Sequence, residues 1–232
     1  MIVIDPTLTL AALVTEHPQL ARRLDRLGID YACGGDRTVA EVCADVGFEM
    51  ARLVGAPIPA TPEDRGWTIL GPGALIDHLE VTHHATTALE LPRLTALAER
   101  VAADEGTHHP ELLDLEAELG VLRGDLEAHM AREEERLFPL VRHAERVHWD
   151  LVGARGLADL LVELRAEHLE NCATLERVRR LTGGYDVPHG ADERHASLVR
   201  GLSELEADLH LHVHKENNLL FPRIEERLRT SV

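Results

Sequence analysis

A gapless internal repeat constrains this chain more than any other feature of its sequence. Residues 125–139 read DLEAHMAREEERLFP, and residues 208–222 read DLHLHVHKENNLLFP. The two segments align without a gap and share the frame DLxxHxxxExxxLFP. Such self-similarity indicates that the chain contains two copies of one structural unit, and the residues that both copies share become the first candidates for function.

Each copy of the repeat carries a histidine and a glutamate four residues apart. His129 precedes Glu133, and His212 precedes Glu216. On a helix, residues at this spacing lie about 40° apart around the axis and point from the same face. Each copy therefore offers one imidazole and one carboxylate in a common direction.

Two further histidines lie at matching distances from the repeat. His84 precedes His129 by 45 residues, and His168 precedes His212 by 44 residues. This predicts two helical hairpins that together collect four histidines and two glutamates inside a bundle. Such a set suits two transition metal ions with the carboxylates bridging them and room for an oxide or hydroxide bridge. Zinc is less well matched, because structural zinc sites commonly use cysteine and none lies in the repeat.

The composition and the helical periodicity predict an all-α fold. Aromatic residues make up only 3% of the chain, while Leu, Ala and Val supply most of the 44% that is hydrophobic. This balance favours helix packing over a β-sandwich. Short connections between the long helical patterns favour an up-down four-helix bundle. The predicted helices span residues 74–104, 110–146, 156–182 and 192–229.

The chain divides into two predicted domains. Residues 1–56 read as a small helical N-terminal domain, residues 57–73 as a proline-rich linker, and residues 74–232 as the bundle. Within the first domain, Thr38 and Glu41 have the spacing of a capping box that starts a helix. Pro18 is predicted to divide the preceding helical segment, and Gly28 and Gly47 to end helices.

Charge and cysteine content exclude several classes of protein. The chain has 24 Lys and Arg against 41 Asp and Glu, a formal net charge of −17, which disfavours nucleic acid and anionic membranes as partners. It shows no apolar run of about 20 residues and no signal peptide, so a cytoplasmic location is expected. Three cysteines, far apart, do not form a disulfide framework, and we expect free thiols at Cys33, Cys43 and Cys172.

Several residues near the repeat have more than one interpretation. His83 projects about 100° away from His84, and only the repeat offset and the family resemblance described below favour His84 as the ligand. Asp125 and Asp208 either orient imidazoles or lie on an exposed face. Glu167 is interpreted as an exposed carboxylate or part of an entry path, and Cys172 as a small core thiol near the site or as a ligand. Surface positions are expected for His108, His109, His143, His148 and His189, positions off the inward face for His210 and His214, and core positions for Leu137, Phe138, Leu220 and Phe221.

Motifs along nearly the whole chain resemble one family. These are YACGGDRTVAEVC, IDHLEVTHHATTALELPRL, HMAREEERLFP, AEHLENCATL and HVHKENNLLFP. Together they resemble the bacterial Repair of Iron Centres proteins of the YtfE/ScdA type, which have a short N-terminal domain before a hemerythrin-like bundle. The resemblance implies two non-haem iron ions, oxo-bridged, with Glu133 and Glu216 as bridging carboxylates. The ligands it implies are His84, His129, Glu133, His168, His212 and Glu216.

The resemblance also implies a function. The family restores iron-sulfur clusters damaged by nitric oxide or peroxide, so damaged iron-sulfur proteins are the expected partners and iron donation the expected mechanism. Two alternatives stay open: reduction of nitric oxide at the diferrous pair, and sensing or carriage of dioxygen or nitric oxide. A homodimer is also left open.

One departure from the family concerns its adjacent cysteine pair. The family has two cysteines before the two glycines, whereas this chain has Ala32 and Cys33. A mechanism that needs a vicinal dithiol therefore does not transfer. Cys33 is interpreted either as a redox or delivery thiol or as an unreactive thiol in a turn.

Overall fold

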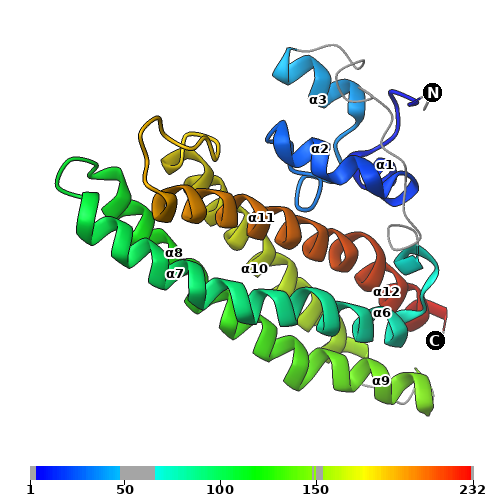
Figure 1. Cartoon of the computed structure of the whole chain (residues 1–232). Helices are drawn as coiled ribbons and strands as arrows, with labels where there is room; N and C mark the ends of the chain where they lie inside the picture. The colour runs from blue at the N-terminus through cyan, green and yellow to red at the C-terminus, as the bar shows by residue number, and fades with distance from the viewer. Residues whose placement is uncertain (1–3, 48–65, 148, 150–153, 231–232) are drawn as a thin grey trace.

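The computed structural model describes residues 4–47, 66–147, 149 and 154–230 (Figure 1). Within these residues the structure is helical, with one isolated bridge between Thr9 and Thr38 and no strand. The predicted all-α bundle is confirmed. No helix in the described ranges is long and apolar enough to cross a membrane.

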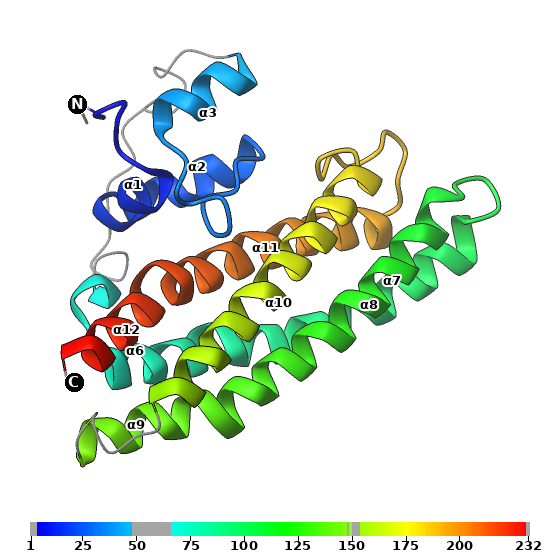
Figure 2. The same cartoon turned by 180° about the vertical axis from the view of Figure 1, so that it is seen from behind.

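Four long helical rods form the bundle, and three of them are interrupted by a π-helical turn. Figures 1 and 2 show the rods lying side by side. α7 packs against α8 and α11, and α10 packs against α8. In chain order the rods are α6 (Pro72–Leu79), η3 (Glu80–His84) and α7 (Ala85–Glu105); α8 (Glu111–Arg132), η4 (Glu133–Leu137) and α9 (Phe138–Arg146); α10 (Ala154–Leu181); and α11 (Glu193–Lys215), η6 (Glu216–Leu220) and α12 (Phe221–Thr230).

The rods lie close to the helices predicted from periodicity. The first begins at Pro72 rather than residue 74, because Pro72 takes the first-turn position, where its missing N–H costs no hydrogen bond. The predicted linker 57–73 lies largely outside the described residues. Its described part contains a short 3₁₀ turn, η2 (Trp67–Ile69), followed by the start of α6.

The apolar interior of the bundle is divided into two cores. One core lies between α6, α9, α12 and the first half of α10, and contains the buried rings Phe138 and Phe221. The other lies between α7, α8, α11 and the second half of α10, around Leu119 and Leu198. Leu137 and Leu220 also lie in the first core, so the four repeat residues predicted to be core residues are confirmed. The polar repeat residues lie between the two cores.

The N-terminal segment forms a small helical unit against α11 (Figures 1 and 2). It consists of α1 (Leu10–Glu16), η1 (Pro18–Leu20), α2 (Ala21–Arg26) and α3 (Val39–Val46). Leu13, Leu24, Tyr31 and Val39 give it an apolar core of its own. The predicted break at Pro18 is confirmed, as are the helix ends at Gly28 and Gly47, which have positive φ.

The predicted capping box at the start of α3 is confirmed. The Thr38 hydroxyl accepts from the Glu41 N–H at 3.2 Å, and the Glu41 carboxylate accepts from the Thr38 N–H at 2.8 Å. We expect Thr38→Ala to lower the free energy of unfolding of the N-terminal unit by about 1 kcal/mol, because the Glu41 N–H loses its acceptor and the Glu41 carboxylate loses the hydroxyl that donates to it. Hydrogen exchange of α3 amides measures this local opening. Thr38→Ser keeps the hydroxyl and should exchange like wild type; faster exchange in Thr38→Ser as well would contradict the cap.

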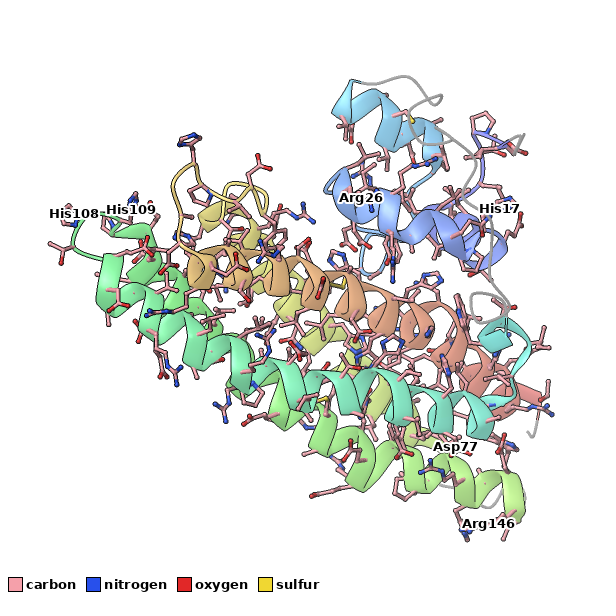
Figure 3. The ribbon with its side chains drawn as sticks, in the orientation of Figure 1. His17, Arg26, Asp77, His108, His109 and Arg146 are labelled. Atoms are coloured by element: carbon pink, nitrogen blue, oxygen red, sulfur yellow. A yellow bond between two sulfur atoms is a disulfide. The ribbon has the colours of Figure 1, made fainter. Side chains whose placement is uncertain are left out.

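Most histidines predicted to lie at the surface are exposed. His108 and His109 lie at one end of the bundle, far from Arg146 (Figure 3). His143 and His189 are exposed too, whereas His148 lies outside the described residues.

The prediction of free thiols is wrong for two of the three cysteines. Cys33 and Cys172 form a disulfide across 139 residues of sequence, while Cys43 is free. Three cysteines far apart in a long chain do not indicate a disulfide framework, and their spacing does not show that the fold places the Cys33 loop against α10.

Candidate metal centre

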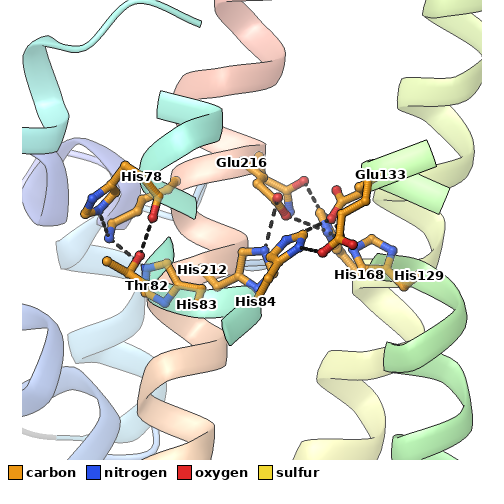
Figure 4. Close-up of polar contacts among 12 residues, drawn as sticks. His78, Thr82, His83, His84, His129, Glu133, His168, His212 and Glu216 are labelled. Carbon is orange, nitrogen blue, oxygen red and sulfur yellow. Dashed lines mark hydrogen bonds and ion pairs between the residues drawn. The ribbon is translucent and has the colours of Figure 1, made fainter. Parts of the chain in front are cut away.

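The six residues selected by the repeat converge between the two cores (Figure 4). They form two overlapping groups, and both groups contain Glu133 and Glu216. One group adds His84 and His212, and the other adds His129 and His168. All six are at most 3% exposed.

The carboxylates stand between the two histidine pairs. One oxygen of Glu216 lies 3.1 Å from Nε2 of His168, and its other oxygen lies 3.1 Å from Nε2 of His212. Oε2 of Glu133 lies 3.4 Å from Nε2 of both His84 and His129. Each carboxylate therefore faces one imidazole from each group, which is the arrangement that a bridging ligand requires.

The π-helical turns coincide with these residues. Glu133 begins η4, Glu216 begins η6, and His84 ends η3. A π-helical turn holds one residue more than an α-helical turn and commonly occurs at functional sites. Here the turns occur at the level where the rods contribute polar side chains.

Unsatisfied polar atoms at the centre fit a metal site. Both oxygens of Glu133 and of Glu216, both ring nitrogens of His212 and Nε2 of His84 are buried without a hydrogen-bond partner among the described residues. A buried polar atom without a partner costs about 1–3 kcal/mol. Imidazole nitrogens and carboxylate oxygens are ligands for ions such as iron, so bound cations would satisfy these atoms.

Carboxylates outside the group orient two of the imidazoles. Nδ1 of His84 donates to Glu134 at 2.8 Å, and Nδ1 of His129 donates to Glu167 at 2.8 Å. Because an ionised carboxylate can only accept, the proton lies on Nδ1 and the Nε2 lone pair is left for a metal. Glu167 also pairs with Arg132 and is only 26% exposed, so the interpretation of Glu167 as an exposed carboxylate is wrong.

A third orienting contact follows the symmetry of the repeat. Asn217 accepts from Nδ1 of His168 at 2.9 Å. Asn217 follows Glu216 just as Glu134 follows Glu133, so the equivalent position in each copy accepts a hydrogen bond from Nδ1 of a candidate histidine ligand. The sequence analysis missed both residues, although the repeat contained the signal one position after each glutamate.

In the ion-free site, neighbouring side chains stabilise the charged forms of His84 and Glu216. Burial would lower the pKa of His84, but the carboxylate of Glu133 raises that pKa to about 9. Burial would raise the pKa of Glu216, but His212 and His168 hold it well below its usual range. Glu216 is thus ionised and His84 carries a proton in the ion-free site, so metal binding must displace that proton. Affinity for metal should therefore rise with pH.

His83 lies outside the ligand groups, although it is buried. Its Nδ1 is bonded to Asp208 at 2.9 Å and its Nε2 lies 2.7 Å from the Lys215 ammonium. Its ring stacks on that of His212 at 5.4 Å. Asp208 therefore orients this neighbouring histidine, whereas Asp125 is exposed.

Lys215 is a buried cation that the sequence analysis did not single out. Its ammonium is 2.9 Å from Nε2 of His78 and lies over the Trp67 ring at 5.1 Å. Burial lowers its pKa to about 8. Its position beside Glu216 places it at the edge of the polar layer.

The orienting carboxylates should tune metal affinity without holding the metal. We expect Glu167→Gln to weaken iron binding by about 10–100-fold, because a neutral amide supports the Nδ1–H of His129 less strongly. Competition with a chromophoric iron chelator measures the change. Glu163→Gln, on the exposed face of the same helix, is the matched control; equal affinities in the two variants would contradict the orienting role.

Comparison with known proteins assigns the bundle. A model of the Hemerythrin HHE cation binding domain matches residues 75–224, which is more than half of the chain. The chain belongs to the hemerythrin HHE family. The buried His and Glu clusters are thus the candidate cation site of a cation-binding domain.

Relatives of this hemerythrin-family chain extend the similarity to its N-terminal unit. The iron-sulfur cluster repair protein YtfE of Escherichia coli O157:H7 is 29% identical over 219 residues, which cover 92% of this chain and 94% of the relative. Proteins of the same name from Enterobacter sp. (strain 638) and Shigella boydii serotype 4 (strain Sb227) match to the same extent. The resemblance noted from the motifs is confirmed.

Proposed function

We propose that this hemerythrin-family protein repairs iron-sulfur clusters damaged by nitrosative or oxidative stress. In this proposal the bundle holds two non-haem iron ions, and iron is the cargo delivered to damaged iron-sulfur proteins in the cytoplasm. His84 and His212 would hold one ion, His129 and His168 would hold the other, and the carboxylates of Glu133 and Glu216 would be shared by both.

The observation that carries the proposal is the pair of buried carboxylates shared by two histidine groups. A single carboxylate with histidines would suit one ion, whereas two shared carboxylates suit two. Their charges offset much of the charge of the two cations, which makes burial of the ions tolerable. When bound, the iron pair supplies redox chemistry and positions open to small ligands.

Similarity to proteins named for iron-sulfur cluster repair supports the biological role. It covers 92% of the chain and therefore includes the N-terminal unit as well as the bundle. A hemerythrin-like bundle alone could carry or sense dioxygen or nitric oxide. The appended unit, which packs on α11 and is linked to α10, favours a delivery role over carriage alone.

Repair of a damaged enzyme tests the proposal. The full chain, loaded anaerobically with iron and shown by Mössbauer spectroscopy to hold an exchange-coupled iron pair, is added to an iron-sulfur enzyme inactivated by nitric oxide. We expect enzyme activity to return faster than with the same amount of free ferrous iron. No recovery with the loaded protein, while free iron succeeds, would overturn the proposal.

The same preparation separates the two alternative functions. Nitrous oxide formed in proportion to nitric oxide consumed would identify nitric oxide reduction at the iron pair. A reversible spectral change on exposure to nitric oxide or dioxygen, with no iron lost to a chelator, would identify a sensor or carrier. Iron transfer to the damaged enzyme without either signal is the result expected here.

A further inference from the structure

A cavity between the N-terminal unit and the bundle contains the sulfur atoms of Cys33 and Cys172. It has a volume of about 370 Å³ and is lined on one side by the loop after α2 and on the other by α10 and α11. The disulfide joins the loop to α10 within this cavity. The cavity is separate from the bundle centre, because none of the six candidate ligands lines it.

Asp30 completes a set of three metal-ligating side chains there. Its carboxylate and the two sulfur atoms lie within 4.8 Å of one another. The carboxylate accepts from the N–H groups of Ala32, Cys33 and Gly34 at 2.8, 2.9 and 3.0 Å. These bonds fix Asp30 beside Cys33 whether or not the disulfide is present.

The glycines of the loop are required by its tight path. A Cβ at Gly34 would lie 2.9 Å from the Asp30 carbonyl oxygen, and a Cβ at Gly35 would lie 2.7 Å from the Tyr31 carbonyl oxygen. Both contacts are with backbone, which cannot move aside cheaply. The CysGlyGly sequence thus builds a compact turn that presents Cys33 and Asp30 together.

The loop is held against the bundle by contacts other than the disulfide. Nδ1 of His210 is 2.9 Å from Asp25, and the Arg179 guanidinium donates to the Asp25 carbonyl oxygen at 2.8 Å. The fully buried Tyr31 ring packs edge-on against His210 and His214. Reduction of the disulfide should therefore leave the two thiols facing each other across the cavity.

We infer that the reduced pair Cys33 and Cys172, together with Asp30, forms a second metal site for a divalent ion such as Fe²⁺ or Zn²⁺. Thiolates and carboxylates are both ligands for such ions, and the cavity leaves room for water as a fourth ligand. The inference goes beyond the proposed function, because it concerns a site outside the bundle centre and requires no iron there.

The redox state of the pair determines whether the site exists. A dithiol reductant opens the disulfide: it gives two electrons and two protons to the sulfurs and becomes a disulfide itself. The two thiols then bind the ion and release two protons. In the reverse direction, hydrogen peroxide takes two electrons from the thiolates and, with two protons, becomes two waters; the disulfide reforms and the ion is released.

The site lies next to the helix that carries a candidate iron ligand. Cys172 follows His168 by one helical turn on α10, and Sγ of Cys33 is 3.4 Å from the His168 carbonyl oxygen. An ion bound here would be held close to the bundle centre and open to solvent through the cavity. This placement fits a transfer site at which peroxide triggers release.

Cobalt binding tests the site directly. The full chain is loaded with iron, reduced, freed of reductant anaerobically and titrated with Co²⁺, which gives a thiolate-to-cobalt charge-transfer absorption only with sulfur ligands. We expect about one equivalent of Co²⁺ per chain to produce this band. The disulfide form and Cys172→Ser should lose it, whereas Cys43→Ser, which changes the free cysteine, should keep it.

Two further measurements keep the inference falsifiable. Asp30→Asn retains an acceptor for the loop N–H groups but loses the charge, and should weaken Co²⁺ binding at least about tenfold; circular dichroism verifies that each variant is folded. Peroxide should release the Co²⁺ and restore a Cys33–Cys172 linked peptide. A charge-transfer band that survives in Cys172→Ser, no band in reduced wild type, or Co²⁺ retained after the disulfide forms would overturn the inference.

Discussion

We expect Glu216→Ala to lower the iron content of the protein from the two ions per chain proposed above to one or none. Glu216 is fully buried, and its two oxygens each lie 3.1 Å from an imidazole of a different group. Its removal takes away a ligand from both ions and a compensating negative charge. We expect affinity to fall by more than the factor of about 10–100 typical of an outer-shell partner. Metal analysis of anaerobically purified protein measures the loss.

A second ligand variant and a control variant accompany this measurement. Glu133→Ala should behave in the same way, because Glu133 occupies the equivalent position in the first copy of the repeat. Glu135→Ala changes an exposed carboxylate two residues further along and should keep full iron content. Both buried variants should remain helical, since the two apolar cores are untouched. Full iron retention in both would contradict the bridging roles.

The largest loss of stability is expected from the aromatic residue of the repeat. Phe221→Ala should lower the free energy of unfolding by about 3–5 kcal/mol, because it opens a cavity in a fully packed core. The Phe221 ring is completely buried, lies parallel to the His168 ring at 5.7 Å and carries the Arg165 guanidinium over it. Against a typical total of about 5–15 kcal/mol, this would leave the bundle marginal.

Urea unfolding of iron-free protein measures this change apart from metal binding. Phe138→Ala, the equivalent change in the first copy, should cost a similar amount, because Phe138 is equally buried and lies beside His84. Leu89→Ala is the control, since Leu89 is 70% exposed and its loss should cost less than about 0.5 kcal/mol. A loss below 1 kcal/mol in both phenylalanine variants would contradict the assignment of these rings to the core.

The candidate ligands could be predicted from the sequence because a duplicated pattern is a strong signal. One His and Glu pair at helical spacing is common on exposed helices. Two copies, each with a further histidine at a matching offset, indicate that four helices contribute side chains to the same layer of the bundle. The choice of His84 over His83 also followed from the offset. The structure adds the reason: His83 is already bonded to Asp208 and Lys215.

What the sequence analysis missed depends on contacts between segments far apart in the chain. Glu167 on α10 orients His129 on the neighbouring α8, and nothing in the local sequence distinguishes Glu167 from an exposed glutamate. The Cys33–Cys172 disulfide depends on how the N-terminal unit packs on α10. Helical periodicity shows which residues of one helix share a face, but it does not show which residues of another helix that face will contact.

The π-helical turns place Glu133 and Glu216 in segments that hold one residue more than a regular helical turn. Each turn is an α-helix with one residue inserted, and the insertion is accommodated locally, so the helical phase on either side is preserved. Loss of a single codon within residues 133–137 would restore a regular helix while both apolar cores keep their register. A change of one residue in the length of such a turn would therefore alter the candidate metal centre while the surrounding helices keep their packing.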